Sequence, residues 1–316
     1  MKTGISQVLL WRYILERNKM KRVYFIVNPH SGKGKYKQLE DKVGQYLDNT
    51  KFQHTIFYTR HRGHAVELVS QAVQEGADIV VAVGGDGTIN EVARALVNTS
   101  VIMAIVPVGS GNGLAHHLHI PASLKKSIYI INQTHVETID TISVNNHICV
   151  SMAGIGFDAI VAEQFDHTHK RGFLSYLKFI LKTYFVFKPH HYIIQSPQIG
   201  SKEVKVLMIS IANSSQWGYN VKISAKASLQ DGKVDICAVK KPPFLTLLGR
   251  VCLLLAGQLD KLKWAEQIYK VQECVLYEKN KALQSCHIDG DPIERQETIH
   301  VKVLPDSLHI ITPRII

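Results

Sequence analysis

The sequence predicts a protein of the α/β + β class, in which an N-terminal parallel-sheet α/β domain is followed by a C-terminal β-sandwich. Strand and helix patterns alternate over the first part of the chain, and short strand-like runs dominate the remainder. Three early strands also run into glycine-rich loops. We expect an extension at 1–20, an α/β domain at 21–134 and a sandwich at 135–303, with residues from about 304 to 316 returning to the α/β domain.

Hydrophobic periodicity supports the first domain. Apolar, β-rich runs occupy residues 22–27, 54–58, 78–83 and 101–106. Between these runs, apolar residues recur at helical spacing over 36–48, 64–75 and 88–97. Because strands alternate with helices, we expect βα units and a parallel sheet covered on both faces.

Beyond about residue 134, short apolar runs follow one another with turn residues between most of them, which is typical of a sandwich. The strand-like runs lie at 136–144, 147–154, 191–195, 203–213, 233–240, 268–278, 298–305 and 307–313. Helical segments are expected at 172–187 and 243–265.

The chain has 316 residues and a formal net charge of +11, which favours an anionic partner: nucleic acid, a phosphorylated ligand or an acidic membrane surface. Charge alone does not choose among these. The five cysteines include no CxxC pair, which argues against structural zinc and a disulfide framework and fits a reducing cytoplasm. The longest apolar stretch, 242–259, is interrupted by Arg250, so no membrane-spanning helix is expected.

The three glycine-rich loops are the clearest functional signal. They read NPHSGKGK at 28–35, GGDG at 84–87 and PVGSGNG at 107–113, and each follows a predicted parallel strand. Their shared sheet edge, with free N–H groups at helix starts, suits a polyphosphate. A Walker A motif is excluded because Gly32 has no glycine five residues earlier, and a dinucleotide fingerprint because Leu114 stands at its last glycine position.

Asp86 lies inside the second loop, where a carboxylate repels phosphate unless a cation or an amide lies between them. Two interpretations stand. Asp86 either caps the helix that begins at Thr88, or orders the loop and binds magnesium or its water beside the phosphates.

Further motifs accompany the loops: the second loop continues as GGDGTINEV and the third as PVGSGNGLAHHLHIP, followed by MAGIGFDA at 152–159, SLQDGKVDI at 228–236 and HIDGDPI at 287–293. The set resembles the diacylglycerol kinase catalytic-domain family, which includes bacterial soluble lipid kinases and is related to sphingosine and ceramide kinases. GGDGT alone also occurs in NAD kinases, but the set is far more specific. The resemblance covers nearly the whole chain from residue 21.

The resemblance implies an ATP-binding α/β domain, a lipid-binding sandwich and an active-site cleft between them, with ATP and Mg²⁺ as cofactors. By position, the residues implied to contact the nucleotide are Asn28, Pro29, His30, Ser31, Gly32, Thr59, Gly84, Gly85, Asp86, Gly87, Thr88, Ile89, Asn90, Glu91, Ser110, Gly111 and Asn112. A structural magnesium is implied at the Asp231 carboxylate and the carbonyls of Ser228 and Lys233, linked through water to Asp140. Without the other motifs, QDGK at 230–233 would be interpreted as a tight turn.

The general base is expected in the sandwich. The family's DGE is Asp289-Gly290-Asp291 here, which keeps the carboxylate but shortens it by one methylene. Asp291, or alternatively Asp289, is expected to accept the proton of the lipid hydroxyl, and Asp86 to help neutralise the phosphates. A surface turn is the competing interpretation of this segment.

We therefore expect an ATP-dependent lipid kinase that phosphorylates diacylglycerol or a sphingoid-like alcohol. Residues 171–191 mix Phe and Leu with lysines, as an interfacial helix or a helix packed on the sandwich would. The expected partners are ATP and a lipid at an anionic membrane surface, without nucleic acid, and the expected location is cytoplasmic and peripheral to the membrane; a homodimer is left open. The alternatives are an NAD kinase-like enzyme and a non-catalytic nucleotide-binding membrane adaptor.

Overall fold

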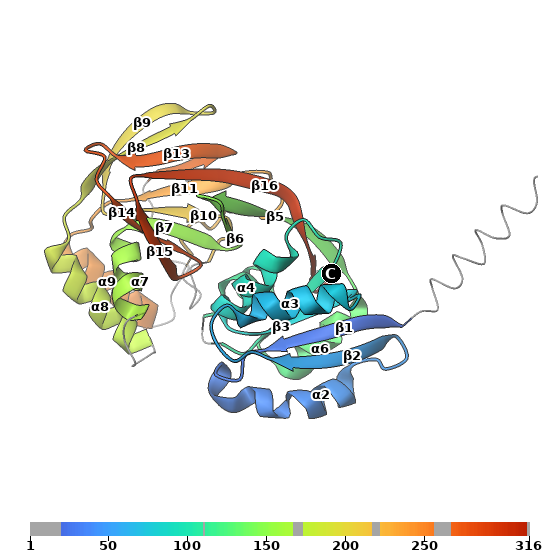
Figure 1. Ribbon diagram of the computed structural model, residues 1–316. Helices are drawn as coiled ribbons and strands as arrows, with labels where there is room; N and C mark the ends of the chain where they lie inside the picture. The colour runs from blue at the N-terminus through green and yellow to red at the C-terminus, as the bar shows by residue number, and fades with distance from the viewer. Residues whose placement is uncertain (1–19, 110, 167–172, 217–221, 256–266, 315–316) are drawn as a thin grey trace, which may run out of the picture.

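The computed structural model describes residues 20–109, 111–166, 173–216, 222–255 and 267–314. Two parts lie side by side (Figure 1), an α/β part formed by the chain up to α6, which ends at Gln133, and a β-rich part formed by the rest. A single long strand, β16, runs along the β-rich part and reaches into the α/β part.

The α/β part has a parallel sheet with strand order β2-β1-β3-β4. Helices α3 and α4 bury their apolar faces on one side of the sheet, and α2 and α6 bury theirs on the other. The elements are β1 (Lys21–Val27), η1 (Gly32–Gln38), α2 (Leu39–Tyr46), β2 (Phe52–Tyr58), α3 (His64–Gln74), β3 (Ile79–Gly84), α4 (Asp86–Leu96), β4 (Ile102–Pro107), α5 (Gly113–His117) and α6 (Leu124–Gln133).

The β-rich part is a sandwich of two sheets. One has the order β12-β11-β10-β7-β14-β15, and apolar side chains from both sheets form the core between them. Helices α7, α8 and α9 pack on the outer face of the six-stranded sheet. The elements are β5 (Val136–Val144), β6 (His147–Cys149), β7 (Met152–Gly156), α7 (Phe157–Asp166), α8 (Phe173–Val186), β8 (His190–Ser196), β9 (Gly200–Val206), β10 (Met208–Ala212), β11 (Val234–Val239), α9 (Phe244–Leu255), β12 (Gln267–Val271), β13 (Glu273–Glu278), β14 (Gln284–Ile288), β15 (Asp291–Gln296) and β16 (Thr298–Ile311).

Strand β16 joins the two parts. It pairs with β13 and β5 in the sandwich, and Ile310 near its end pairs in parallel with Met103 of β4. The second sheet of the sandwich and the parallel sheet are therefore one continuous sheet. The predicted fold class, a parallel-sheet α/β domain followed by a β-sandwich, is confirmed.

Several predicted strands have the wrong limits. The runs 147–154, 203–213 and 268–278 are each two strands, and the two halves belong to different sheets. In each run, apolar side chains on both sides of the bend enter the same core, so the apolar pattern continues across the bend and hides it. Conversely, 298–305 and 307–313 fall in one strand, β16, whose pairing with β5 is interrupted by a bulge at Asp306, where φ is 49°.

Candidate active site

The three glycine-rich loops meet at the carboxyl edge of the parallel sheet. The backbone N–H of Asn28, after β1, donates to the carbonyl of Val83 on β3 at 2.9 Å. The N–H of Val108, after β4, donates to the carbonyl of Gly84 at 3.0 Å. Neighbouring loops are thus hydrogen-bonded side by side, as the predicted sheet requires.

Two glycines let these loops approach closely. A Cβ atom on Gly109 would lie 2.5 Å from the Cα of Gly85, so the second and third loops touch through their backbones. Gly32 has a φ of 72°, and a Cβ there would lie 2.5 Å from the carbonyl oxygen of Val108. Larger residues at either place would push the loops apart.

Asp86 holds the third loop against the second. Its two carboxylate oxygens accept the backbone N–H groups of Asn112 and Gly113, at 2.8 and 2.7 Å. These donors open α5, so Asp86 caps that helix instead of its own; α4 itself has Gly85 at its N-cap, without a side-chain hydrogen bond. The interpretation that Asp86 caps the helix at Thr88 is therefore wrong, whereas an ordering of the loops by its carboxylate agrees with these contacts.

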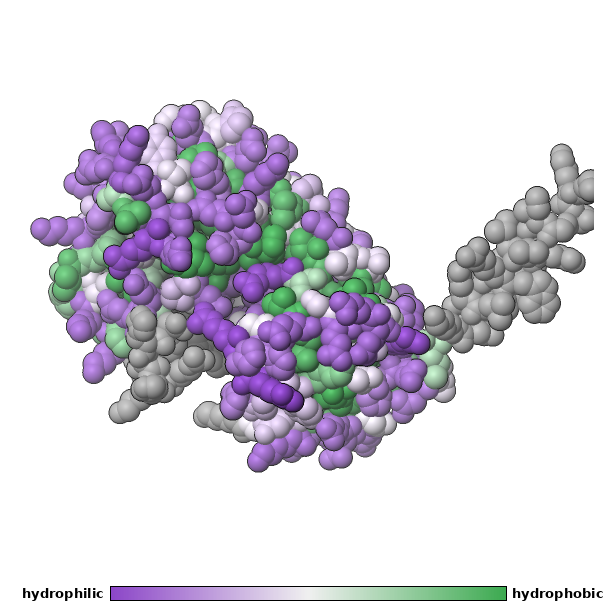
Figure 2. Space-filling view, viewed as in Figure 1, coloured by the Kyte–Doolittle hydropathy of each residue, from purple (hydrophilic) through white to green (hydrophobic). Residues whose placement is uncertain are grey.

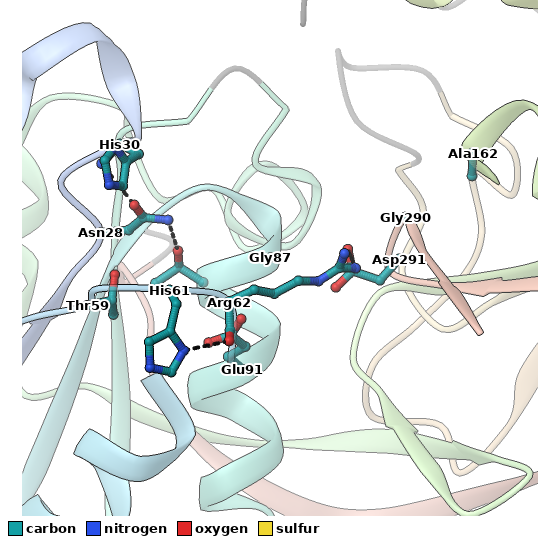
Figure 3. A pocket seen from close by; sticks show the side chains of 11 residues that line it. Asn28, His30, Thr59, His61, Arg62, Gly87, Glu91, Ala162, Gly290 and Asp291 are labelled. Atoms are coloured by element: carbon teal, nitrogen blue, oxygen red, sulfur yellow. Dashed lines mark hydrogen bonds and ion pairs between the residues drawn. The ribbon is translucent and has the colours of Figure 1, made fainter. Parts of the chain in front are cut away.

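Two further side chains brace this edge. The Nδ2 group of Asn28 donates to Oγ1 of Thr88 at 3.1 Å, which links the first loop to the second. Glu91 accepts the N–H groups of Gly63 and Ala65, at 2.8 and 3.2 Å, and so holds the segment that follows β2. That segment carries His61 and Arg62 beside the loops (Figure 3).

Asp289 lies at the junction of the two parts. Its carboxylate accepts backbone N–H groups from Val150, Ser151 and Met152 at 2.8–3.0 Å, and the side-chain amide of Asn90 on α4 also donates to it. Burial raises the pKa of the Asp289 carboxyl, and the hydrogen bonds from the backbone oppose that rise. With these donors in place, Asp289 has little capacity left to accept a proton from a substrate.

Asp291 differs from Asp289 in both exposure and partners. Its side chain is 44% exposed, and Oδ1 lies 2.7 Å from Nη2 of Arg62, which reaches across from the α/β part (Figure 3). This ion pair crosses a cavity of about 400 Å³ between the two parts. The residues that line the cavity are Asn28, His30, Thr59, His61, Arg62, Gly87, Thr88, Glu91, Ala162, Gly290 and Asp291.

Six of the seventeen residues implied to contact the nucleotide line the cavity, as does Asp291; the six are Asn28, His30, Thr59, Gly87, Thr88 and Glu91. Gly84, Gly85, Gly111 and Asn112 form the loops behind it, Ile89 is buried in the core, and Ser110 lies outside the described residues. His61 and Arg62 were not predicted from the sequence, although TRHRGHA at 59–65 follows a parallel strand and so reaches the same edge. Ala162 was not predicted either, since α7 was not predicted.

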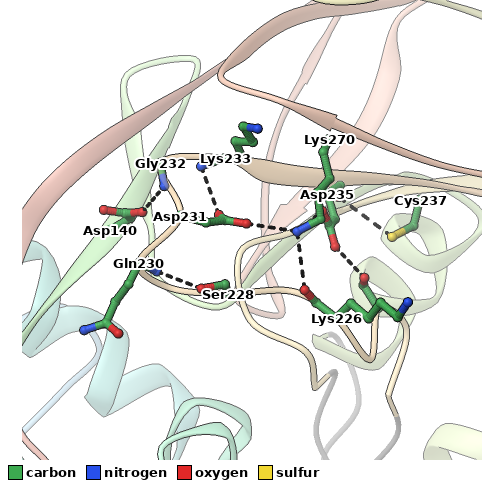
Figure 4. A network of polar contacts seen from close by, with 11 residues as sticks. Asp140, Lys226, Ser228, Gln230, Asp231, Gly232, Lys233, Asp235, Cys237 and Lys270 are labelled. Carbon is green, nitrogen blue, oxygen red and sulfur yellow. Dashed lines mark hydrogen bonds and ion pairs between the residues drawn. The ribbon is translucent and has the colours of Figure 1, made fainter.

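At the position where the resemblance implies magnesium, the Asp231 carboxylate instead contacts a lysine ammonium and a backbone N–H group (Figure 4). Oδ1 of Asp231 accepts the N–H of Lys233 at 3.1 Å, and Oδ2 lies 2.9 Å from the ammonium of Lys270. Asp140 accepts the N–H groups of Gly232 and Asp306 directly, at 2.8 and 2.9 Å. Because an ammonium already neutralises the carboxylate, these residues do not fit a divalent cation.

A loop edge of this kind holds a polyphosphate, and a carboxylate facing it from a second domain is the arrangement expected of a kinase. Comparisons with known proteins agree with this class. Residues 22–144 match the diacylglycerol kinase catalytic domain, and residues 151–312 match the YegS C-terminal NAD kinase beta sandwich-like domain. The chain therefore belongs to the family of diacylglycerol kinases and YegS-like lipid kinases, and it is an enzyme of the lipid-kinase class.

Individual relatives are distant but extensive. The chain is 25% identical to a diacylglycerol kinase of Staphylococcus carnosus, over 81% of this chain and 84% of that protein. It is 27% identical to a probable lipid kinase YegS-like protein of Citrobacter koseri, over 90% and 94%. A crystal structure of a diacylglycerol kinase from Bacillus anthracis has the same fold, with a TM-score of 0.67, 18% identity and coverage of 93% and 98%.

The two carboxylates of the DGD segment should differ in their effect on stability. Asp289→Asn replaces an acceptor of several N–H groups by a group with one acceptor oxygen, which leaves donors unsatisfied at about 1–3 kcal/mol each. We expect the melting temperature to fall by at least about 2–4 °C, measured by differential scanning fluorimetry. Asp291→Asn removes only an exposed ion pair, worth about 0–1 kcal/mol, and is the matched control. Equal melting temperatures for the two variants would contradict this assignment.

Proposed function

We propose that the protein transfers the γ-phosphoryl group of ATP, taken as its magnesium complex, to the hydroxyl of a membrane lipid, either diacylglycerol or a related sphingoid-like alcohol. The observation that carries this proposal is the cavity that the glycine-loop edge shares with Asp291. A phosphoryl donor held on one part of the protein can there meet an acceptor hydroxyl held by the other.

The α/β part would bind the nucleotide. Backbone N–H groups at the starts of the loops and helices suit phosphate oxygens, and Thr88 and Thr59 add hydroxyl groups to the cavity wall. His61 and Arg62 supply groups that can carry positive charge on the same wall. Since phosphoryl transfer depends mostly on positioning and on neutralising charge, these residues would place the γ-phosphoryl group at the mouth of the cleft.

Asp291 would act as the general base. In the transfer, its carboxylate takes the proton of the lipid hydroxyl, the hydroxyl oxygen bonds to the γ-phosphorus, and the bond to the β–γ bridging oxygen breaks to release ADP. The exposure of Asp291 and its single ion pair support this choice over Asp289. Arg62 lines the same cavity and lies 2.7 Å from Asp291, so its positive charge would attract a phosphate oxygen close to the base.

We further propose that the ends of α8 and α9 dock on an anionic membrane. Their exposed apolar side chains, the α8–α9 patch, are Phe185, Val186, Phe244, Leu245 and Leu248. The rings of Phe185 and Phe244 lie 5.1 Å apart, and Figure 2 shows apolar among hydrophilic side chains at this end of the molecule. Lys182 on α8, Lys188 just beyond it and Lys241 just before α9 supply positive charge nearby.

Helix α7 connects the α8–α9 patch to the cavity. Helix α8 packs against α7, and Ala162 of α7 lines the cavity wall. A lipid whose hydroxyl is raised from the membrane at this patch would therefore approach the side of the cleft where Asp291 stands. None of the described helices is long and apolar enough to span a membrane.

The acceptor can be identified by incubating the protein with labelled ATP and Mg²⁺ and a panel of acceptors. We expect label in a lipid extracted from mixed micelles that contain diacylglycerol or a sphingoid base, and none in NAD. Labelled NADP would establish the NAD kinase-like alternative. Binding of ATP without transfer to any member of the panel would favour the non-catalytic adaptor.

Asp291→Asn should lose most of its kcat, by about 10²–10⁴-fold, with the KM for ATP nearly unchanged, because the nucleotide is held by the other part of the protein. Asp291→Glu should remain active, because its longer side chain restores the residue that the family pattern carries. Initial rates on the labelled lipid measure both. Wild-type turnover in a folded Asp291→Asn variant would remove Asp291 from the chemistry.

Replacing Phe185 and Leu245 by serine should weaken sedimentation with vesicles that contain an anionic lipid by about tenfold or more, since each buried apolar side chain contributes about 1.5–3 kcal/mol. Phe185 is 65% exposed, so Tyr129→Ser on α6, where the tyrosine is 61% exposed, is a matched control that should bind like the wild type. High salt should also release the protein, because attraction between lysines and anionic lipid is screened. Unaltered binding of the double variant would place the membrane contact elsewhere.

A further inference from the structure

Lys270 projects into the loop where the family resemblance implies a metal ion. It stands on β12 directly opposite Asp235 of β11 in the strand register. Its ammonium lies 2.9 Å from Oδ2 of Asp231, 3.6 Å from Oδ1 of Asp235 and 3.4 Å from the carbonyl oxygen of Lys226 (Figure 4). Two carboxylates and a carbonyl, all oxygen groups that a hard cation would attract, thus converge on this one charged nitrogen.

The buried carboxylate of Asp235 requires a positive charge such as the Lys270 ammonium close to it. The Asp235 side chain is only 3% exposed, and besides Lys270 it is held by the hydroxyl of Ser224 at 2.5 Å. A buried carboxylate without a compensating charge is strongly destabilising.

The attachment of this loop to the rest of the β-rich part also forms without an ion. Asp140 on β5 accepts the N–H of Gly232 from the loop and the N–H of Asp306 from β16, and its own N–H donates to the carbonyl of Leu229 at 2.6 Å. These direct contacts hold the 226–233 loop to β5 and β16, where a metal-and-water bridge would otherwise be needed.

We propose that the Lys270 ammonium takes the place of a structural divalent cation in this protein. The 226–233 loop and its attachment to Asp140 are then ordered by a covalently attached charge, and their stability is independent of magnesium. This inference concerns the architecture of the sandwich and does not rest on the proposed lipid substrate or on the identity of the base.

The first test compares the wild type with Asp231→Asn, without nucleotide, in EDTA and in millimolar MgCl₂. Melting temperatures are read by differential scanning fluorimetry. We expect magnesium to change the melting temperatures of the two proteins equally, because Asp231 binds no ion. A magnesium-dependent rise in the wild type that Asp231→Asn lacks would overturn the proposal.

The second test removes the ammonium while keeping an unbranched side chain, with Lys270→Met. Lys233→Met is the matched control, because Lys233 lies on the same loop and is exposed, and only its backbone N–H contacts Asp231. In EDTA we expect Lys270→Met to melt at least about 2–4 °C below Lys233→Met. Added Mg²⁺ or Ca²⁺ should then raise the melting temperature of Lys270→Met alone, because the vacated oxygen groups attract a cation.

Each result decides the matter. Equal melting temperatures for Lys270→Met and Lys233→Met would show that the Lys270 ammonium does not stabilise the fold, which would also overturn the proposal. If Lys270→Met is destabilised and neither Mg²⁺ nor Ca²⁺ restores its melting temperature, Lys270 forms only an ordinary ion pair. That result would overturn the proposal that its ammonium replaces a metal ion. If Lys270→Met does not fold, the comparison of wild type with Asp231→Asn still tests the proposal.

Discussion

The hydrogen bonds around Asp289 are the constraint on which the arrangement of the two parts depends. One carboxylate collects three backbone N–H groups from the turn between β6 and β7 and the side-chain amide of Asn90 from the helix that follows the GGDG loop. The same residue has a left-handed φ of 49°, which turns the chain sharply into Gly290 and Asp291. Fixing Asp289 therefore fixes how far Asp291 stands from the glycine loops.

Each carboxylate of the motifs needs hydrogen-bond donors or a positive charge to satisfy its oxygens, and the donors differ from one residue to the next. Asp86 and Glu91 are satisfied by helix N-termini, Asp140 by loop N–H groups, and Asp231 by a lysine ammonium. Such partners are fixed parts of the fold, so these carboxylates organise structure. Asp291 is instead paired across an open cavity with a long, half-exposed arginine, a weak and exchangeable partner. That contrast distinguishes Asp291 from the other acidic residues of the motifs, because its side chain is exposed and lines the cavity.

The sequence predicted what depends on local pattern. Strand and helix alternation located the parallel sheet, and glycine loops after successive strands located its functional edge, because parallel strands bring their carboxyl ends together. The split of 203–213 between β9 and β10 could not be predicted, since apolar residues continue through the bend and only the third dimension separates the sheets. The contact between Lys270 and Asp231 could not be predicted for a related reason. Lys270 lies 39 residues from Asp231, and only the pairing of β12 with β11 brings it to that loop.

The continuous sheet explains how a cleft between two parts can remain well defined. Strand β16 pairs with β5 and β13 in the sandwich and with β4 in the α/β part, so bending at the junction would break backbone hydrogen bonds. Large rotation of one part against the other is therefore disfavoured on the β16 side. Beside the cavity, the Arg62–Asp291 pair adds to the hydrogen bond between Asn90 and Asp289, and an exposed ion pair of this kind opposes opening by only about 0–1 kcal/mol. The junction is therefore held along β16 and by the hydrogen bond between Asn90 and Asp289. The Arg62–Asp291 pair is an exposed contact that is weak enough for an anionic ligand of the cavity to displace.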